Sequence, residues 1–135
     1  KLNVTLHHNY FHNLVQRAPR VRFGKVHVYN NYYQTDDENG AYRYAYSLGV
    51  GKNSKIYAEN NVADIDGRTY QDFVKVFGGT EFTAVNNIFN DEKIDAFNEH
   101  LSPVAWAPER YIKIDDVSAV KEKVLQHAGV LKNED

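Results

Sequence analysis

The sequence has no cysteine and no long run of apolar residues. The absence of cysteine excludes a disulfide framework, a thiolate metal site and a cysteine nucleophile. The apolar stretches fall short of the roughly 18 residues that a membrane-spanning helix needs, so we expect no membrane partner. A length of 135 residues is enough for one domain with a modest core.

The net charge is only −2, because the chain has 16 Lys and Arg residues and 18 Asp and Glu residues. Proteins that bind nucleic acid over a broad surface are usually strongly basic, so we expect no nucleic-acid partner. Helical periodicity is scarce in most of the chain, whereas ten tyrosines and many asparagines are present. This composition is typical of strands joined by tight turns.

Four segments of strand-like residues align without gaps along the chain. Each contains two polar residues in succession, of which the second is asparagine, at positions 9, 31, 61 and 87. The intervals between these asparagines are 22, 30 and 26 residues. The segments are Val4–Phe11, Val26–Tyr33, Ile56–Ala63 and Phe82–Phe89.

Repeats of this length with strand character indicate a solenoid. We predict an all-β fold, a right-handed parallel β-helix of four coils, in which equivalent residues stack roughly 4.8 Å apart. The repeated asparagines would form a ladder at a turn, because their amides both donate and accept and they tolerate left-handed geometry. The predicted interior columns are Val4, Val26, Ile56 and Phe82, and Leu6, Val28, Ala58 and Ala84. A β-sandwich or barrel stays open, although its hairpins would not require an asparagine pair in every unit.

A second strand precedes the later repeats, at residues 20–23, 47–50 and 73–77. We expect the glycines that follow to form the corner to the next strand; these are Gly24, Gly51 and Gly78. The loops then fall at about residues 12–19, 34–45 and 64–72, on the side of a solenoid that often binds ligand. Alternation along residues 20–23 predicts Val21 and Phe23 inside and Arg20 and Arg22 outside.

We divide the chain into coils at residues 1–92, an irregular packing segment at 93–114, a helix at 115–129 and a tail at 130–135. Asp115 and Asp116 suit the start of this helix, and Gly129 suits its end. Its apolar stripe would be Val117, Val120, Val124 and Ala128. Because strand-like residues begin almost at Lys1, we expect earlier coils, and pairing of the open first coil with an N-terminal fragment or a second copy.

The densest charge cluster contains Arg17, Arg20, Arg22 and Lys25. Pro19 favours an extended conformation of Ala18, so it ends the loop that contains Arg17. Guanidinium groups bind carboxylate and phosphate in a bidentate manner. From these residues alone, an anion-binding site and a set of solvated arginines paired with acids of adjacent coils are equally open.

The first 33 residues carry a more specific signal. Arg17, Pro19 and Arg22 are spaced as Arg-x-Pro-x-x-Arg, with His7-His8-Asn9 before them and His27 to Asn31 after them. These segments resemble the signature of calcium-dependent pectate lyases, the first polysaccharide lyase family. The similarity extends along nearly the whole chain and includes Gly49-Val50-Gly51 and Glu59-Asn60-Asn61.

The resemblance implies a pectate lyase, which cleaves (1→4)-α-D-galacturonan, the polymer of pectate, by β-elimination and leaves 4,5-unsaturated products. It implies that Arg17 is the base that removes the C5 proton, and that Arg22 binds substrate carboxylate. We expect the neighbouring Arg20 to bind substrate as well. The resemblance also implies a Ca2+ cofactor and secretion to the extracellular space. The family's calcium ligands belong to earlier coils, so we expect no metal ligand in this chain and an isolated chain could be inactive.

Other side chains are weaker candidates. The acidic residues Asp36, Asp37, Glu38, Asp64 and Asp66 lack the spacing of a calcium loop. His7 and His8 could suggest a metal pair, but neighbouring strand residues point to opposite faces, so we expect His8 to join the polar ladder. His27 should form hydrogen bonds on an outward face, and Trp106 should pack under the C-terminal segment. A sugar cleft could be lined by Tyr42, Arg43, Tyr44 and Tyr46, or these residues could pack over the coils.

Two other functions stay open at this point. A pectin hydrolase on the same architecture would need two carboxylates that flank the scissile bond, and no such pair lies beside the arginine cluster in the sequence. A non-catalytic β-helical module that binds carbohydrate, or a scaffold fragment without the calcium site, is the main alternative.

Overall fold

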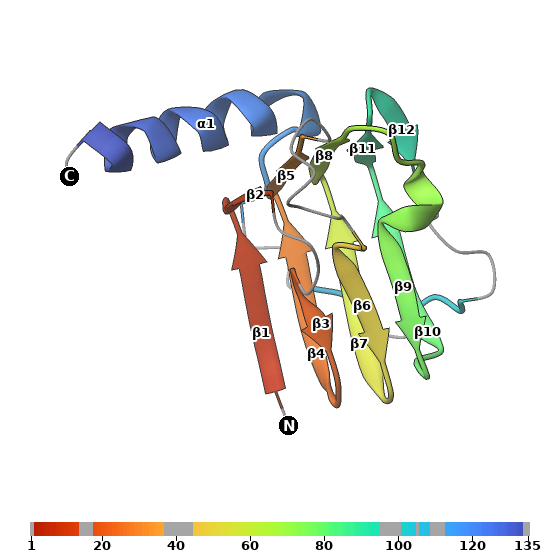
Figure 1. Cartoon of the computed structure of the whole chain (residues 1–135). Helices are drawn as coiled ribbons and strands as arrows, with labels where there is room; N and C mark the ends of the chain where they lie inside the picture. Colours follow the sequence, from red (N-terminus) through yellow and green to blue (C-terminus); the bar gives the residue numbers. More distant parts are fainter. Residues whose placement is uncertain are drawn as a thin grey trace.

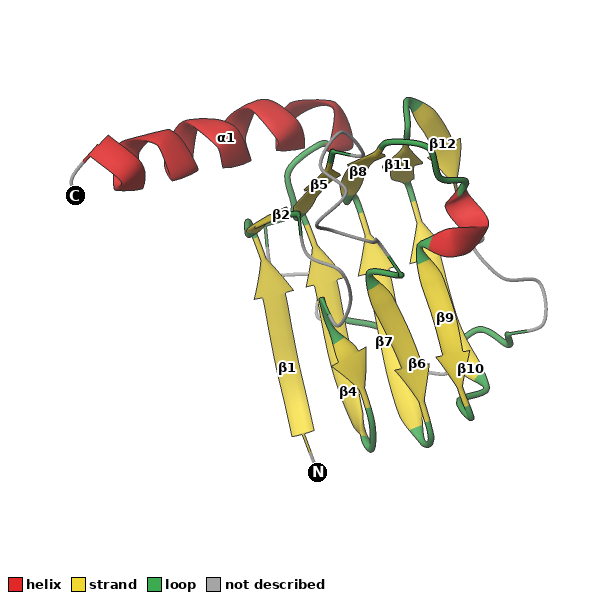
Figure 2. Cartoon of the chain, in the orientation of Figure 1, coloured by secondary structure: helices red, strands yellow, loops and turns green. Residues whose placement is uncertain are grey.

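The computed structural model describes residues 2–13, 18–36, 45–94, 101–104, 106–108 and 113–133. Within this part of the chain, three sheets run side by side along one axis and form the coils of a β-helix. One helix packs against the outside of the coils, at the end of the molecule drawn at the top of Figures 1 and 2.

The first sheet contains β1 (Leu2–His7), β4 (Gly24–Tyr29), β7 (Ser54–Glu59) and β10 (Glu81–Val85), all parallel. Its register aligns Val4, Val26, Ile56 and Phe82, and also aligns Leu6, Val28, Ala58 and Ala84. Both predicted interior columns are therefore confirmed. Val28, Ile56 and Ala58 are completely buried, so these columns lie at the centre of the core.

The second sheet contains β2 (Tyr10–His12), β5 (Tyr32–Thr35), β8 (Val62–Ile65) and β11 (Asn87–Phe89), and ends in β12 (Glu92–Ile94), which is antiparallel to β11. The third sheet contains β3 (Arg20–Val21), β6 (Leu48–Gly51) and β9 (Val74–Phe77), which follows the short 3-10 helix η1 (Tyr70–Asp72). The parallel registers between successive coils confirm the predicted β-helix, and the antiparallel pair β11–β12 lies at the last strand of the second sheet.

Two consecutive polar residues build the corner between the first and second sheets. The first of them, His8, Asn30, Asn60 or Asn86, has a φ between 51° and 57°, the left-handed region that asparagine enters more readily than most residues. The second forms the ladder. The amides of Asn9, Asn31 and Asn61 donate to the Oδ1 atoms of Asn31, Asn61 and Asn87 at 3.1, 3.1 and 3.0 Å. The predicted ladder is confirmed, and the left-handed conformation belongs to the residue before it.

The corner between the third and first sheets differs from the prediction. Gly24 and Gly51 lie within strands, and the left-handed residues are Phe23 (φ 57°), Asn53 (φ 59°) and Gly78 (φ 84°). Only Gly78 has the predicted role. Because β3 ends at Val21, the alternation stops there, and Phe23 is 46% exposed rather than inside.

The C-terminal segment packs along the outer face of the first sheet. The backbone N–H of Val104 donates to Thr83 Oγ1 at 2.9 Å. The Trp106 ring meets the Tyr57 ring edge-on, with 6.3 Å between centroids, so Trp106 packs against the coils as expected.

Helix α1 (Val117–Asn133) follows this segment. It begins later than the predicted residue 115 because Asp116 is its cap, with Oδ1 accepting from the Ser118 N–H at 3.0 Å. It continues through Gly129, because glycine permits a helix to end but does not compel it to. Val120 and Val124 are buried against Tyr32 and Val62 of the second sheet. No helix in the described part of the chain is long and apolar enough to cross a membrane.

Candidate functional site

The structure divides the predicted cluster: Arg20 lies on β3 and Arg22 directly after it, whereas Lys25 lies on β4 of the first sheet, with its Nζ 5.9 Å from the centre of the Trp106 ring. Arg17 lies outside the described residues. Its neighbour Ala18 is buried, and the Ala18 N–H donates to the Ser47 carbonyl at 2.8 Å. The Tyr33 hydroxyl donates to the Ala18 carbonyl, also at 2.8 Å. The residue that follows Arg17 is thus fixed between two coils.

Pro19 continues this fixed segment into the third sheet. Its carbonyl accepts from the Gly49 N–H at 2.9 Å, and β3 then pairs Arg20 with Gly49 and Val21 with Val50. Val21 is buried, whereas Arg20 is exposed, as alternation predicts.

The Arg20 side chain crosses the neighbouring strand and reaches the next one. Its guanidinium carbon lies 3.8 Å from the centre of the Phe77 ring, on β9. Gly49 of β6 makes room for this path, because a Cβ atom there would lie 2.8 Å from Arg20 Cγ. The Phe77 ring also contacts the ring of Tyr46, with 5.2 Å between centroids. The Arg20 guanidinium group therefore lies against the Phe77 ring, which in turn contacts Tyr46.

Arg22 has an aromatic neighbour of its own. Its guanidinium carbon lies 4.9 Å from the centre of the Phe23 ring. Both side chains are exposed, and Phe23 has an unusual left-handed backbone for a bulky residue. Strained residues of this kind cluster at binding sites, where the surrounding structure holds them in place.

Neither Arg20 nor Arg22 forms an ion pair with a carboxylate in the described part of the chain. Other exposed or half-buried cations do, such as Lys55, whose Nζ lies 2.9 Å from Glu81 Oε2. The described acids therefore give no support to the interpretation of the cluster as arginines neutralised by acids of adjacent coils, and this interpretation stays an untested alternative for Arg20 and Arg22. Their donors face solvent and can bind an anionic ligand.

No group of three or more His, Cys, Asp and Glu side chains that could hold a metal ion occurs among the described residues. Asp64 accepts from the Tyr32 hydroxyl at 2.6 Å and from Lys121 at 2.9 Å, and Asp66 lies in an exposed turn. Asp36 lies 3.5 Å from His12 Nε2, and Asp37 and Glu38 lie outside the described residues. The described acidic side chains do not fit a calcium ion.

Three histidines that lie on or directly after strands of the first sheet, His7, His8 and His27, form hydrogen bonds. His8 Nε2 lies 2.7 Å from Asp115 Oδ2, and His8 occupies a left-handed corner position. Because His8 follows the strand, its Nδ1 comes within 2.8 Å of His7 Nδ1, contrary to the expectation of opposite faces. Burial, then the nearby His8 and His27, lower the pKa of His7. His27 is buried, with its Nε2 2.7 Å from Glu59 Oε2, so the predicted hydrogen-bonding role is confirmed.

Of the tyrosine-rich segment, Tyr46 lies among the described residues. Tyr46 is buried against Phe77, which favours its packing role over a sugar cleft. Tyr42, Arg43 and Tyr44 lie outside the described residues.

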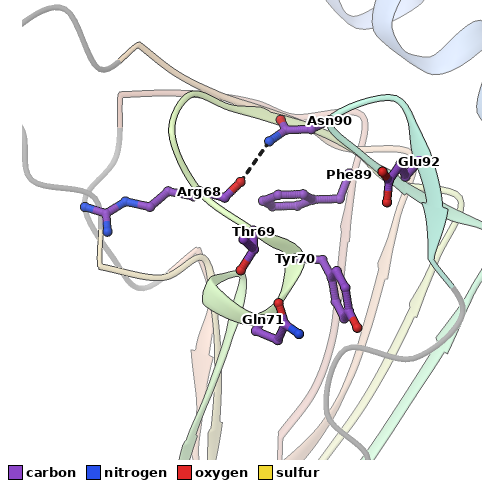
Figure 3. Close-up of a pocket in the computed structure, with 7 residues that line it drawn as sticks. All are labelled: Arg68, Thr69, Tyr70, Gln71, Phe89, Asn90 and Glu92. Carbon is purple, nitrogen blue, oxygen red and sulfur yellow. Dashed lines mark hydrogen bonds between the residues drawn. The ribbon is translucent and has the colours of Figure 1, made fainter.

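A separate pocket of about 360 Å³ lies between the η1 loop and the β11–β12 hairpin (Figure 3). The Asn90 amide donates to the Arg68 carbonyl at 3.1 Å across it. Its lining residues are Arg68, Thr69, Tyr70, Gln71, Phe89, Asn90 and Glu92. None of the predicted site residues lines this pocket, so we place the candidate site on the open face of the third sheet instead.

Two members of this face were missed from the sequence, namely Lys75 and Phe77. The available signal was the strand at 73–77, which repeats the position of the arginine strand. The register pairs Lys75 with Gly49, which pairs with Arg20, so all three belong to one outward row.

Several known proteins with similar sequences are pectate lyases. A family model described as pectate lyase matches residues 1–133. A pectate lyase of Bacillus subtilis (strain 168) is 46% identical over 98% of this chain. Pectate lyase A of Emericella nidulans is 36% identical over 96% of it.

Solved structures agree. A pectate lyase bound to a hexasaccharide has a TM-score of 0.83 and 45% identity over 90% of this chain. Another, studied for its substrate specificity and anti β-elimination mechanism, has a TM-score of 0.84 and 46% identity, also over 90%. The chain spans about a third of the length of these relatives, 32% of the Bacillus protein and 31% of each structure. With a family model that matches almost all of its residues, this chain belongs to the pectate lyase family.

Proposed function

We propose that this chain carries the proton-abstracting base and the substrate-binding arginines of a pectate lyase, which cleaves (1→4)-α-D-galacturonan by β-elimination. The observation that carries the proposal is the anchored Arg-x-Pro-x-x-Arg segment at the third sheet, whose described arginines are exposed and have no acidic partner in the described part of the chain. Membership of the pectate lyase family supports the assignment of substrate.

In the proposed reaction, Arg17 takes the proton from C5 of a galacturonate residue, next to its carboxylate. The electron pair of the C5–H bond becomes the C4–C5 double bond, and the glycosidic C4–O bond breaks. The leaving oxygen takes up a proton, so the products are a new chain end and a 4,5-unsaturated sugar. No water is added, which distinguishes this reaction from hydrolysis.

Arginine is an unusual base, because its free pKa exceeds about 12. A base must be neutral when it takes the proton, and nearby cations disfavour the charged form of a cationic group. Arg20 and Arg22 are within five residues of Arg17 and have no described acidic partner to offset their charge. The same cations would stabilise the negative charge that develops on the substrate carboxylate.

We assign substrate carboxylate binding to Arg22 and Arg20. A guanidinium can donate two parallel hydrogen bonds to a carboxylate, which fixes the orientation of the sugar as well as its position. The rings of Phe23 and Phe77 restrict these two side chains before substrate arrives, so less conformational freedom is lost on binding.

Pectate lyases are generally calcium-dependent, and we propose the same for this protein. Because no described group of acidic side chains fits calcium, we assign no calcium ligand to the described residues and no chemical step to the ion. Pectate lyases are also generally secreted, and we propose an extracellular location, where the polymeric substrate would be met.

The products decide between the candidate functions. The protein is mixed with polygalacturonate and calcium, and both ultraviolet absorbance of unsaturated products and new reducing ends are followed. Elimination predicts that both rise together. Reducing ends without that absorbance would show hydrolysis, and binding without either product would show a carbohydrate-binding module.

A further inference from the structure

The outward row of the third sheet continues past the proposed site. Arg20, Gly49 and Lys75 are register partners on β3, β6 and β9, so their side-chain positions follow one another along the axis at the spacing of the strands, about 4.8 Å. Gly49 has no side chain, so the Arg20 side chain passes over it and places its guanidinium group beside Phe77 on β9, the strand that carries Lys75. Figure 1 shows β3, β6 and β9 side by side on one face of the coils.

Both cations share one aromatic ring. Arg20 lies 3.8 Å from the centre of the Phe77 ring, and Lys75 Nζ lies 5.5 Å from it. Lys75 is exposed, and neither cation forms an ion pair with a carboxylate in the described part of the chain. Two like charges held near each other without a counter-charge repel, and an anion bound between them relieves that repulsion.

A polyuronate has the chemistry that such a row would recognise, because it carries one carboxylate on every sugar. On the basis of the proposed function, we infer that Lys75 and the Arg20–Phe77 pair form a further carboxylate-binding subsite. This subsite binds a second galacturonate of the same polymer chain, which lies closer to β9 than the galacturonate that Arg22 binds. Lys75 is a substrate-binding residue in this account and takes no part in proton transfer.

The inference predicts an effect on binding that depends on chain length. Replacing Lys75 by alanine should raise KM for polygalacturonate about fivefold and leave kcat unchanged, since an exposed ion pair contributes up to about 1 kcal/mol. Short oligogalacturonates that do not reach β9 should show no change. Lys75→Arg should restore most of the affinity. Lys93→Ala, at an exposed strand position of the second sheet, is the matched control.

The outcomes separate this inference from the proposed function. Suppose that the wild-type enzyme is active. If Lys75→Ala has the same KM as the wild type, or a KM that rises equally for short and long substrates, the subsite is overturned and the proposed function stands. A wild-type protein without unsaturated product contradicts the proposed function. In that case direct titration with polygalacturonate decides: weaker binding of Lys75→Ala than of Lys93→Ala supports the subsite, and equal binding overturns it.

Discussion

At the scale of the residue, two consecutive polar residues in each coil have different roles at the corner between the first and second sheets. The first adopts the left-handed backbone, and the second connects its coil to the next. Asn61 shows how completely the ladder residue is used. Its Oδ1 accepts from Asn31, and its Nδ2 donates both to Asn87 Oδ1 and to the Val28 carbonyl, at 2.9 to 3.1 Å.

Replacing Asn61 by alanine should therefore lower the free energy of unfolding by about 2–4 kcal/mol, because several buried polar groups lose their partners. Chemical denaturation measures the change. Asn3→Ala, at an exposed position of β1, is the control and should change stability by less than about 0.5 kcal/mol. Equal stabilities for the two variants would contradict the role of the ladder.

Asp115 gives a prediction for pH. Its hydrogen bonds from His8 and then Lys123 lower the pKa of its carboxyl group below the ordinary 3.8. A lowered folded-state pKa means that the carboxylate stabilises the folded protein above pH 3.8, and that this contribution is lost as the pH falls through the folded-state pKa.

Asp115→Asn should accordingly be less stable than the wild type at neutral pH, and the difference should shrink as the pH falls toward 2. Denaturation at a series of pH values gives both curves. A difference that stays constant with pH would show that the charge of Asp115 contributes nothing.

The site residues illustrate what a sequence can specify at this scale. The outward direction of Arg20 follows from alternation in a strand, and the structure confirms it. Phe23 could not be placed in this way, because the end of β3 at Val21 depends on how the coil turns. The contact of Arg20 with Phe77 joins residues 57 positions apart, so no local pattern contains it.

At the scale of the element, glycines in the third sheet lie where a neighbouring strand leaves no space for a side chain. A Cβ atom on Gly51 would lie 2.3 Å from the Val21 carbonyl oxygen. The glycine at this position is thus required by the neighbouring strand β3, and the sequence pattern wrongly assigned it to a corner. Gly78 is the opposite case, with a left-handed φ of 84° and no atom within 4 Å of the position that a Cβ atom would take.

The two glycines should respond differently to substitution. Gly51→Ala must push β3 away from β6, and we expect a loss of about 3 kcal/mol or more in stability. Gly78→Ala meets no neighbour and should cost only about 1–2 kcal/mol for the left-handed backbone. Thermal unfolding of both variants tests the comparison, and a milder effect for Gly51→Ala than for Gly78→Ala would contradict the packing argument.

At the scale of the whole molecule, the repeat made the architecture predictable. Equivalent residues recur at each coil, and the register follows once the strands are parallel. The functional loops carry no such repetition. Their lengths differ between coils, and the position of Arg17 depends on a loop of one coil alone.

The proposed calcium dependence is also a property of the whole molecule, because no group of side chains among the described residues fits a calcium ion. Removing calcium from the protein with EDTA should abolish formation of unsaturated product, and added calcium should restore it. The thermal midpoint of these coils should change little, since their strands are held by hydrogen bonds and apolar packing. Full activity in EDTA would contradict the proposed dependence on calcium.

The central claim is that Arg17 is the base of an eliminative reaction, and the kcat of Arg17→Ala on polygalacturonate tests it most directly. Ultraviolet absorbance of the unsaturated product gives the rate, and Arg68→Ala, an exposed arginine of the η1 loop, is the control. The account predicts that kcat falls by at least about a hundredfold in Arg17→Ala, as expected for loss of a general base, and stays near the wild-type value in Arg68→Ala. A kcat for Arg17→Ala equal to that of the wild type would contradict it.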